Sequence, residues 1–262
     1  MIGAIIGDTV GSVYEFHNIR TKDFNILNER ARFTDDTVCT IAFMDYFLHA
    51  EKYDEKTATE YLHKWTRKYP HRGYGGKFLM WVLSDNPKPY NSFGNGSAMR
   101  ISSVAWVAKD LDELKKLSDT VTSITHNHQE GMKGALVIAT CIFMARNGAT
   151  KEEIKEYAIK QYPEIGFYDY EMLRENYGFD ETCPGSVPEA IYCFLISKDF
   201  EDCLRTTISI GGDCDTTAAM SCAIAEAFYK DIPEQLVNHV FGKLSEEMKN
   251  VIIKFKEKYG GQ

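Results

Sequence analysis

The segment GGDCDTTAAMSCAIAEAF, residues 211–228, joins a glycine pair and two aspartates to a run of small residues. Its apolar side chains recur at helical spacing, which predicts a helix over residues 218–228. The opening segment GAIIGDTVG, residues 3–11, carries glycine at every fourth position and predicts a helix with one bare ridge. Each glycine costs about 1 kcal/mol relative to alanine inside a helix, so a close neighbour must compensate. We expect these two helices to pack backbone to backbone.

Helical spacing of apolar residues continues along the rest of the chain, and alternation at strand period is scarce. With 262 residues and 44% hydrophobic content, the chain is long enough for one substantial core. We therefore predict an all-α fold, a compact orthogonal helical bundle that forms a single domain over residues 1–262. A final helix is expected to begin with Pro233 as its first residue. Two stretches, 69–97 and 162–188, are predicted to be long loops that form walls of a site.

Composition excludes several functional classes. No stretch approaches about 18 uncharged apolar residues, and the first segment lacks the features of a secretory signal, so a soluble cytoplasmic protein without a membrane partner is expected. The seven cysteines are scattered and contain no Cys-x-x-Cys pair, which is typical of reduced thiols in a core. The net charge of −8 and the absence of a basic stripe argue against generic nucleic-acid binding.

Two acidic motifs carry the main chemical signal. Thr34-Asp35-Asp36-Thr37 opens one predicted helix, and Asp213-Cys214-Asp215-Thr216 precedes another, in a turn that Gly211 and Gly212 permit. Hard carboxylate and hydroxyl oxygens suit Mg²⁺ or Mn²⁺, and four acids without a basic residue would repel one another unless cations neutralise them. The alternatives are a capping box at the first motif and an N-cap aspartate at the second, which leaves one of its two aspartates unexplained.

A glycine-rich turn is the best candidate for binding phosphate. Gly94-Asn95-Gly96-Ser97 resembles a backbone nest, and Tyr90 and Phe93 beside it could stack on an adenine ring. The turn lacks the lysine and spacing of a P-loop. His126 is interpreted as a hydrogen-bond donor to substrate because His126 and His128 lack zinc-type partners, although neither histidine need be functional. Gly212 would let a ligand approach the backbone closely.

In this order, the motifs resemble those of the ADP-ribosylglycohydrolase family, which includes the dinitrogenase reductase activating glycohydrolase and the eukaryotic ADP-ribosyl hydrolases. The resemblance spans residues 7 to 217: the opening helix from Gly7-Asp8 to Glu15, the first acidic motif, the glycine loop from Gly94 to Arg100, Thr125-His126, and the second acidic motif. It implies an all-helical fold with a binuclear magnesium or manganese centre, with Mg²⁺ favoured over Mn²⁺.

The resemblance also implies roles for individual residues. The implied metal ligands are Thr34, Asp35, Asp36, Asp213, Asp215 and Thr216. The implied contacts to ADP-ribose are Gly94, Asn95, Gly96, Ser97 and His126, to which Phe93 and Gly212 are added from the reasoning above. Glu15 matches the glutamate that lies at the scissile bond in the serine-specific members, and Asp35 and Asp36 are the other candidate catalytic residues, because other members rely more on the metal-motif aspartates.

The function predicted from the sequence is metal-dependent hydrolysis of an N- or O-glycosidic bond between ADP-ribose and a modified target. The expected target is a protein side chain. The anomeric carbon gains oxocarbenium character as the glycosidic bond breaks, and acids beside that bond can accept or donate the proton that the reaction requires. A monomer is expected. Two rivals stay open: a non-catalytic protein that binds ADP-ribose, since fold alone does not confer activity, and a metal-dependent phosphohydrolase.

Overall fold

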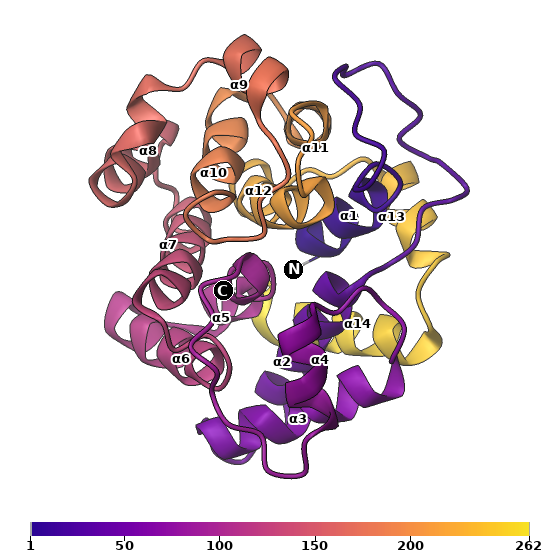
Figure 1. Ribbon diagram of the computed structural model, residues 1–262, viewed down its shortest axis with the longest axis vertical. Coiled ribbons are helices and arrows are strands. Elements are labelled where there is room, and N and C mark those ends of the chain that lie inside the picture. Colours follow the sequence, from indigo (N-terminus) through magenta and orange to yellow (C-terminus); the bar gives the residue numbers. More distant parts are fainter. Residues whose placement is uncertain (1, 262) are drawn as a thin grey trace.

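The computed structural model describes residues 2–261 and is built from helices, which confirms the predicted all-α class (Figure 1). No β-strand is assigned in this range, and one isolated antiparallel bridge joins Gly94 to Thr182. The helices are α1 (Gly3–Gly11), α2 (Asp35–His49), α3 (Glu55–Lys68), α4 (Gly76–Leu83), α5 (Ser102–Val107), α6 (Leu111–Ser123), α7 (Gln129–Arg146), α8 (Lys151–Gln161), α9 (Tyr170–Asn176), α10 (Val187–Ile196), α11 (Phe200–Ser209), α12 (Cys214–Tyr229), α13 (Glu234–Phe241) and α14 (Glu246–Tyr259), with short 3₁₀ turns η1 (Asn95–Ser97) and η2 (Pro163–Phe167).

The glycine ridge of α1 lies directly against α12, as expected from the sequence (Figure 1). A methyl group placed on Gly7 would lie 2.1 Å from the carbonyl oxygen of Ala218, and one on Gly3 would lie 2.3 Å from that of Cys222. At Gly11 the nearest atom would be the α-carbon of Asp215, at 2.4 Å. Only a residue without a side chain fits at these three positions, and α1 is buried along its whole length.

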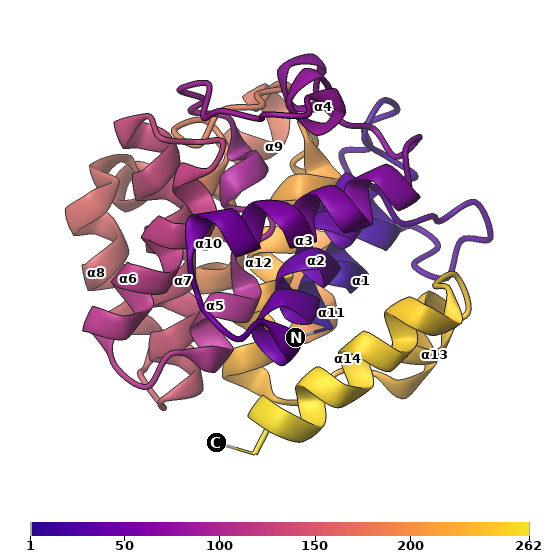
Figure 2. The same ribbon diagram turned by 90° about the horizontal axis from the view of Figure 1, so that it is seen from below.

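The remaining helices surround this central pair. α10 and α11 pack on α12, α7 packs on α12 and α6, and α2 packs on α1, α3 and α14. Seen from below, α13 and α14 lie together along one side of the molecule, and α4 lies at the opposite side (Figure 2). The buried apolar residues form one large cluster that extends through nearly all of these helices. Within residues 2–261, no helix is both long and apolar enough to cross a bilayer.

Local signals explain where the two site helices begin. Thr34 is the N-cap of α2, and its side-chain oxygen accepts a hydrogen bond from the backbone of Asp36. Asp213 is the N-cap of α12, and Gly211 and Gly212 both adopt a φ of +72°, which a side chain would strain. Asp215 lies in the first turn of α12 rather than in the preceding loop, which corrects the prediction that both aspartates sit in the turn.

Three other predicted boundaries are also corrected. The loop predicted over 69–97 contains α4, whose sequence KFLMWVL is apolar enough to form a helix between glycine and proline clusters. The loop predicted over 162–188 contains η2 and α9, which begins after the N-cap Asp169. Pro233 is the N-cap of α13 and not its first residue. The seven cysteines are free and buried, as predicted.

Candidate active site

Asp8, at the middle of α1, organises the first acidic motif. Its Oδ2 accepts hydrogen bonds from the backbone amides of Thr34 (3.0 Å) and Thr37 (3.1 Å) and from the Thr37 hydroxyl. Its Oδ1 accepts from the Thr34 hydroxyl at 2.6 Å. The carboxylate therefore binds the unsatisfied amides at the N-terminus of α2, where the helix dipole favours negative charge. Burial raises the pKa of Asp8, and these four hydrogen bonds oppose that rise.

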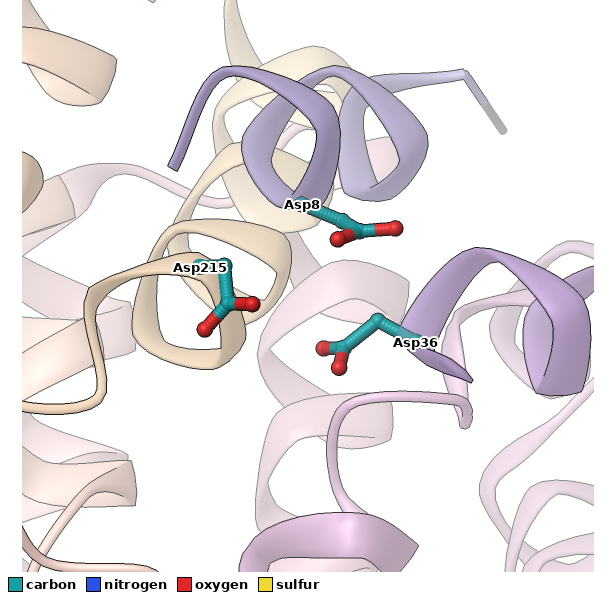
Figure 3. A group of neighbouring side chains, drawn as sticks. All are labelled: Asp8, Asp36 and Asp215. Atoms are coloured by element: carbon teal, nitrogen blue, oxygen red, sulfur yellow. The ribbon is translucent and has the colours of Figure 1, made fainter. Parts of the chain in front are cut away.

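Three carboxylates from three helices point into one space (Figure 3). Oxygens of Asp8 in α1, Asp36 in α2 and Asp215 in α12 lie within 4.8 Å of one another, and all three residues are buried. The Thr216 hydroxyl donates to Asp36 Oδ2 at 3.2 Å, whereas Asp36 Oδ1 is buried without a hydrogen-bond partner. Burial, and then the charge of neighbouring aspartates, raises the pKa of Asp36 and of Asp215 well above the usual value.

A second group of acids shares Asp215 with the first. Oxygens of Glu15, Asp213 and Asp215 also lie within 4.8 Å of one another. Asn95, from the glycine-rich turn, donates from Nδ2 to Asp213 Oδ2 at 2.7 Å and so links that turn to the acids. Burial, and then the charge of Asp213, raises the pKa of Glu15 to about 7.

The donor set fits divalent cations. The two groups contain five acids, and none of them forms an ion pair with a basic side chain in residues 2–261. Oxygen-only ligands are what Mg²⁺ and Mn²⁺ prefer, and buried charges are normally paired or bound to a metal. The unpartnered Oδ1 of Asp36 is a ligand atom that nothing else in the described chain uses. Asp215 is common to both groups.

Four of these acids, Glu15, Asp36, Asp213 and Asp215, form the floor of a pocket of about 350 Å³, here called the glycine-loop pocket. Glu15, Asp35 and Asp36 contribute to its floor together with residues of the second acidic motif. Its walls come from the start of α4, from the turn around Gly94, and from Glu181 and Thr182, which the backbone bridge at Gly94 holds beside that turn. The walls include aromatic and basic side chains: Lys77, Phe78, Tyr90, Phe93, Arg100 and His126.

Hydrogen bonds favour one tautomer of His126. The Thr125 hydroxyl accepts from the buried Arg100 guanidinium at 2.6 Å, which leaves its own proton to donate to His126 Nδ1, 2.7 Å away. A neutral His126 then carries its proton on Nε2, which faces Gly94 and Gly96. Burial, and then the Arg100 charge, lowers the pKa of His126 well below its usual value. His126 can therefore donate a hydrogen bond into the pocket but does not readily become charged.

The structure brings together most of the site residues predicted from sequence. Glu15, Asp36, Asp213 and Asp215 supply the two acid groups, and Thr216 binds Asp36. The other predicted residues that line the glycine-loop pocket are Asp35, Phe93, Gly94, Asn95, Gly96 and His126.

Asp35 belongs to neither acid group, and Thr34 contacts the first group through hydrogen bonds. Asp35 lines the pocket without joining either group, and burial, then the Asp8 charge, raises its pKa to about 8. The Thr34 hydroxyl is engaged with Asp8.

Two predicted substrate contacts do not line the pocket. The Ser97 hydroxyl donates to the Gly131 carbonyl at 2.9 Å and is buried behind the glycine-rich turn. Gly212 is covered by the chain itself, because a methyl group there would lie 2.3 Å from the Tyr177 ring. Its amide also donates to the Asn18 side chain at 2.9 Å.

Sequence reasoning did not assign Asp8 to the site. Asp8 lies on the opening helix among apolar and glycine residues, and it is completely buried. A lone acid in such a helix was the available signal, because a buried carboxylate requires a hydrogen-bond or metal partner.

Known proteins resemble this chain over nearly its full length. A family model described as ADP-ribosylglycohydrolase matches residues 1–260. The human protein named ADP-ribosylhydrolase ARH3 is 28% identical over 89% of this chain and 86% of its own length. The Pseudomonas putida protein named ADP-ribosylarginine hydrolase Tri1 is 24% identical over 87% of this chain and 69% of its own. A solved structure titled ADP-ribosylglycohydrolase-related protein complex superposes with a TM-score of 0.73 at 22% identity, covering 98% of this chain and 95% of that one.

Proposed function

The chain belongs to the ADP-ribosylglycohydrolase family, and on that premise we propose that it hydrolyses the bond between ADP-ribose and a modified target, with two divalent cations at its buried acids. The observation that carries the proposal is the convergence of Asp8, Asp36 and Asp215 with Glu15 and Asp213 in two acid groups that share Asp215, with every one of these acids except Asp8 lining one pocket. Five acids cannot all be ionised there without cations, and a ribose with its hydroxyls is a ligand that such cations attract.

The walls of the glycine-loop pocket support binding of the ADP portion. His126 offers its Nε2 proton beside Gly94 and Gly96, a position suited to a diphosphate oxygen. Tyr90 and the half-exposed Phe93 offer ring faces for adenine. With the diphosphate at the glycine-rich turn, the second ribose of ADP-ribose would reach the acids, because Asn95 connects that turn directly to Asp213.

The acids would hold the cations and orient the ribose. The ligands proposed are Asp36, Asp213, Asp215 and Thr216, with Asp8 added from the structure and Asp35 and Thr34 retained from the sequence. Bound Mg²⁺ or Mn²⁺ would supply electrostatic stabilisation of the ribose hydroxyls and of charge that develops in the reaction. Asp8 fixes the start of α2 and thereby aims Asp36 into the site.

Glu15 is the candidate for proton transfer at the scissile bond. It lies beyond the end of α1 on the pocket floor, is only partly buried, and has its carboxylate beside Asp213 and Asp215. A carboxylate in this position can take a proton from the attacking water or give one to the departing group, as the acids of glycosidases do. Asp35 and Asp36 remain alternative candidates for this role.

The test is release of free ADP-ribose from ADP-ribosylated substrates of defined linkage, assayed with Mg²⁺, Mn²⁺ or EDTA. We expect release with either metal and none with EDTA. Asp36→Asn and Asp215→Asn should each lower turnover by about 100-fold or more, by the loss of a group aimed at the reacting centre. Asp112→Asn, an exposed acid on α6, is the matched control and should retain wild-type turnover.

The outcomes distinguish the rival functions. Binding of ADP-ribose without any release would favour a non-catalytic binding protein, and a phosphate product would favour a phosphohydrolase. Full turnover of Asp215→Asn in the presence of metal would contradict the proposed use of the acid groups.

A further inference from the structure

A second hollow adjoins the glycine-loop pocket and is here called the exit lobe. It has a volume of about 390 Å³ and shares Glu15, Asp35 and Gly73 with the glycine-loop pocket. The two hollows therefore meet at the acids. The walls that belong to the exit lobe alone are Phe16, Arg32, Phe33, Thr34, His71 and Arg72.

The exit lobe differs in charge from the pocket floor. Its own charged side chains are the guanidinium groups of Arg32 and Arg72, and neither group forms a salt bridge in residues 2–261. Arg32 is exposed, and its charge acts on Glu15. Both guanidinium groups are therefore available to a ligand that enters from solvent.

The chain holds Arg72 in position. Its guanidinium lies 3.8 Å from the centre of the Phe33 ring, and Nη1 donates to the Phe33 carbonyl at 3.3 Å. Its own carbonyl accepts from the Asp35 amide at 2.8 Å, which joins the residue to the first turn of α2. The following Gly73 has a φ of +99°, so the chain turns sharply at the junction of the two hollows.

This arrangement separates the two ends of a substrate. If the ADP portion fills the glycine-loop pocket and its second ribose lies at the acids, the group attached to that ribose continues into the exit lobe. In the hydrolysis, the bond from ribose C1 to the target atom breaks and a bond from C1 to the water oxygen forms. One water proton ends on the target atom. The exit lobe therefore contacts the leaving group and its neighbours in the target.

Resting on the proposed hydrolase function, we propose that Arg32 and Arg72 select targets in which ADP-ribose is attached to a hydroxyl side chain within an acidic segment, and that they disfavour ADP-ribosylarginine. With divalent cations at the acids, the exit lobe carries net positive charge. Opposite charges on the target are then attracted and a guanidinium leaving group is repelled. Exposed pairs of this kind depend on ionic strength.

The experiment compares three substrates with the full chain and Mg²⁺. Two are peptides with one ADP-ribosylserine, flanked by Glu and Asp in one and by Lys and Arg in the other, and the third carries ADP-ribosylarginine between neutral residues. We expect kcat/KM for the acidic peptide to exceed that for the basic peptide about tenfold at low ionic strength. At about 1 M NaCl, where the screening length is about 3 Å, the ratio should approach one. ADP-ribosylarginine should be cleaved most slowly.

Charge reversal at Arg32 and charge removal at Arg72 test the two residues directly. Arg32→Glu removes no side-chain hydrogen bond given by the structure and should invert the ratio between the acidic and basic peptides. Arg72→Gln keeps a side chain over Phe33 and should lower the ratio several-fold. Lys254→Glu, an exposed residue of α14, makes the same charge change away from the site and should leave the ratio unaltered.

The outcomes separate this selection from the hydrolase activity itself. Release of ADP-ribose with equal rates from both serine peptides, fastest release from ADP-ribosylarginine, or an unchanged ratio in Arg32→Glu would overturn the selection and leave the hydrolase standing. No release from any substrate, with wild-type protein that binds Mg²⁺, would overturn the hydrolase and the selection together.

Discussion

Asp8 illustrates how one side chain connects the helices to the site. It accepts four hydrogen bonds from Thr34 and Thr37, and it lies with Asp36 and Asp215 in the first acid group. The negative charge of Asp8 is unfavourable beside the other acids but favourable beside the N-terminus of α2. The residue therefore has two roles, one structural and one electrostatic, and removal of its carboxylate should separate them.

Replacing Asp8 with alanine should destabilise the metal-free protein by about 3 kcal/mol, because the buried amides of Thr34 and Thr37 lose their acceptor. The free energy of unfolding in urea measures this change. Thr9→Val is the control in the same helix, since the Thr9 hydroxyl is buried without a partner and its loss should cost little. Equal stability of the two variants would contradict the role given to Asp8.

Glu15→Gln should affect turnover far more than binding. If Glu15 transfers a proton, the amide should lower kcat by about 10²–10⁴-fold while the Kd for ADP-ribose changes little. Steady-state kinetics and calorimetric titration of ADP-ribose with Mg²⁺ present give the two quantities. Loss of ADP-ribose binding in parallel with kcat would instead indicate that Glu15 serves mainly to hold a cation.

At the scale of elements, the contact between α1 and α12 determines the site. The first acid group joins Asp8 of α1 to Asp215 of α12, and the second joins Glu15, which follows α1, to Asp213 and Asp215 at the start of α12. The contact is close because glycines at 3, 7 and 11 present only backbone to α12. The sequence predicted this packing correctly, since glycines on one helical ridge have no other evident compensation.

Gly7→Ala should push α1 away from α12, because the added methyl group would lie 2.1 Å from a backbone carbonyl oxygen that cannot turn aside. We expect a loss of about 3 kcal/mol and a fall in melting temperature of roughly 6–12 °C. Gly178→Ala is the control, because no atom lies within 4 Å of its added methyl group. A Gly7→Ala protein as stable as wild type would show that the two helices can separate without cost.

The boundaries of α4 and α9 show where element prediction failed. Glycine and proline around residues 73–96 predicted a loop, yet KFLMWVL forms a helix whose Phe78 and Trp81 are buried. Tertiary burial of aromatic side chains outweighed the local turn signals there. In 162–188 the short helix α9 begins at a capping aspartate that the sequence reading passed over.

At the scale of the whole molecule, the acids make stability depend on pH and on metal. Their folded-state pKa values are raised, to about 7 for Glu15 and about 8 for Asp35, above the ordinary value of about 4. Between these limits the folded protein holds more protons than the unfolded chain. The stability that these two groups contribute to the metal-free protein should therefore be complete below about pH 4. It should fall as the pH rises toward 8.

Thermal melts in EDTA at pH 5 and pH 8 measure this dependence, and the melting temperature should be lower at pH 8. Added Mg²⁺ should raise the melting temperature again, because binding to the folded protein adds about 2.7 kcal/mol to the free energy of unfolding at a Mg²⁺ concentration 100 times its Kd. Asp215→Asn removes one buried charge and should flatten the pH dependence. A melting temperature that rises from pH 5 to pH 8 without metal would contradict the raised pKa values.

The sequence by itself determined the class of fold, the family and the start of α2 at the first acidic motif. Apolar spacing, the glycine ridge of α1 and the capping residue Thr34 are local properties of the chain, so they can be read without coordinates. The predicted metal and substrate residues, and a single domain over residues 1–262, stay predictions for the experiments above.

Tertiary structure alone decided which side chains converge. It added Asp8 to the acids, left Asp35 outside both acid groups, buried Ser97 and Gly212 behind the pocket wall, and opened the exit lobe beside Arg32 and Arg72. The physical reason is that these outcomes depend on where helices distant in sequence cross. The spacing of residues along one helix defines its faces, but only packing determines what each face meets.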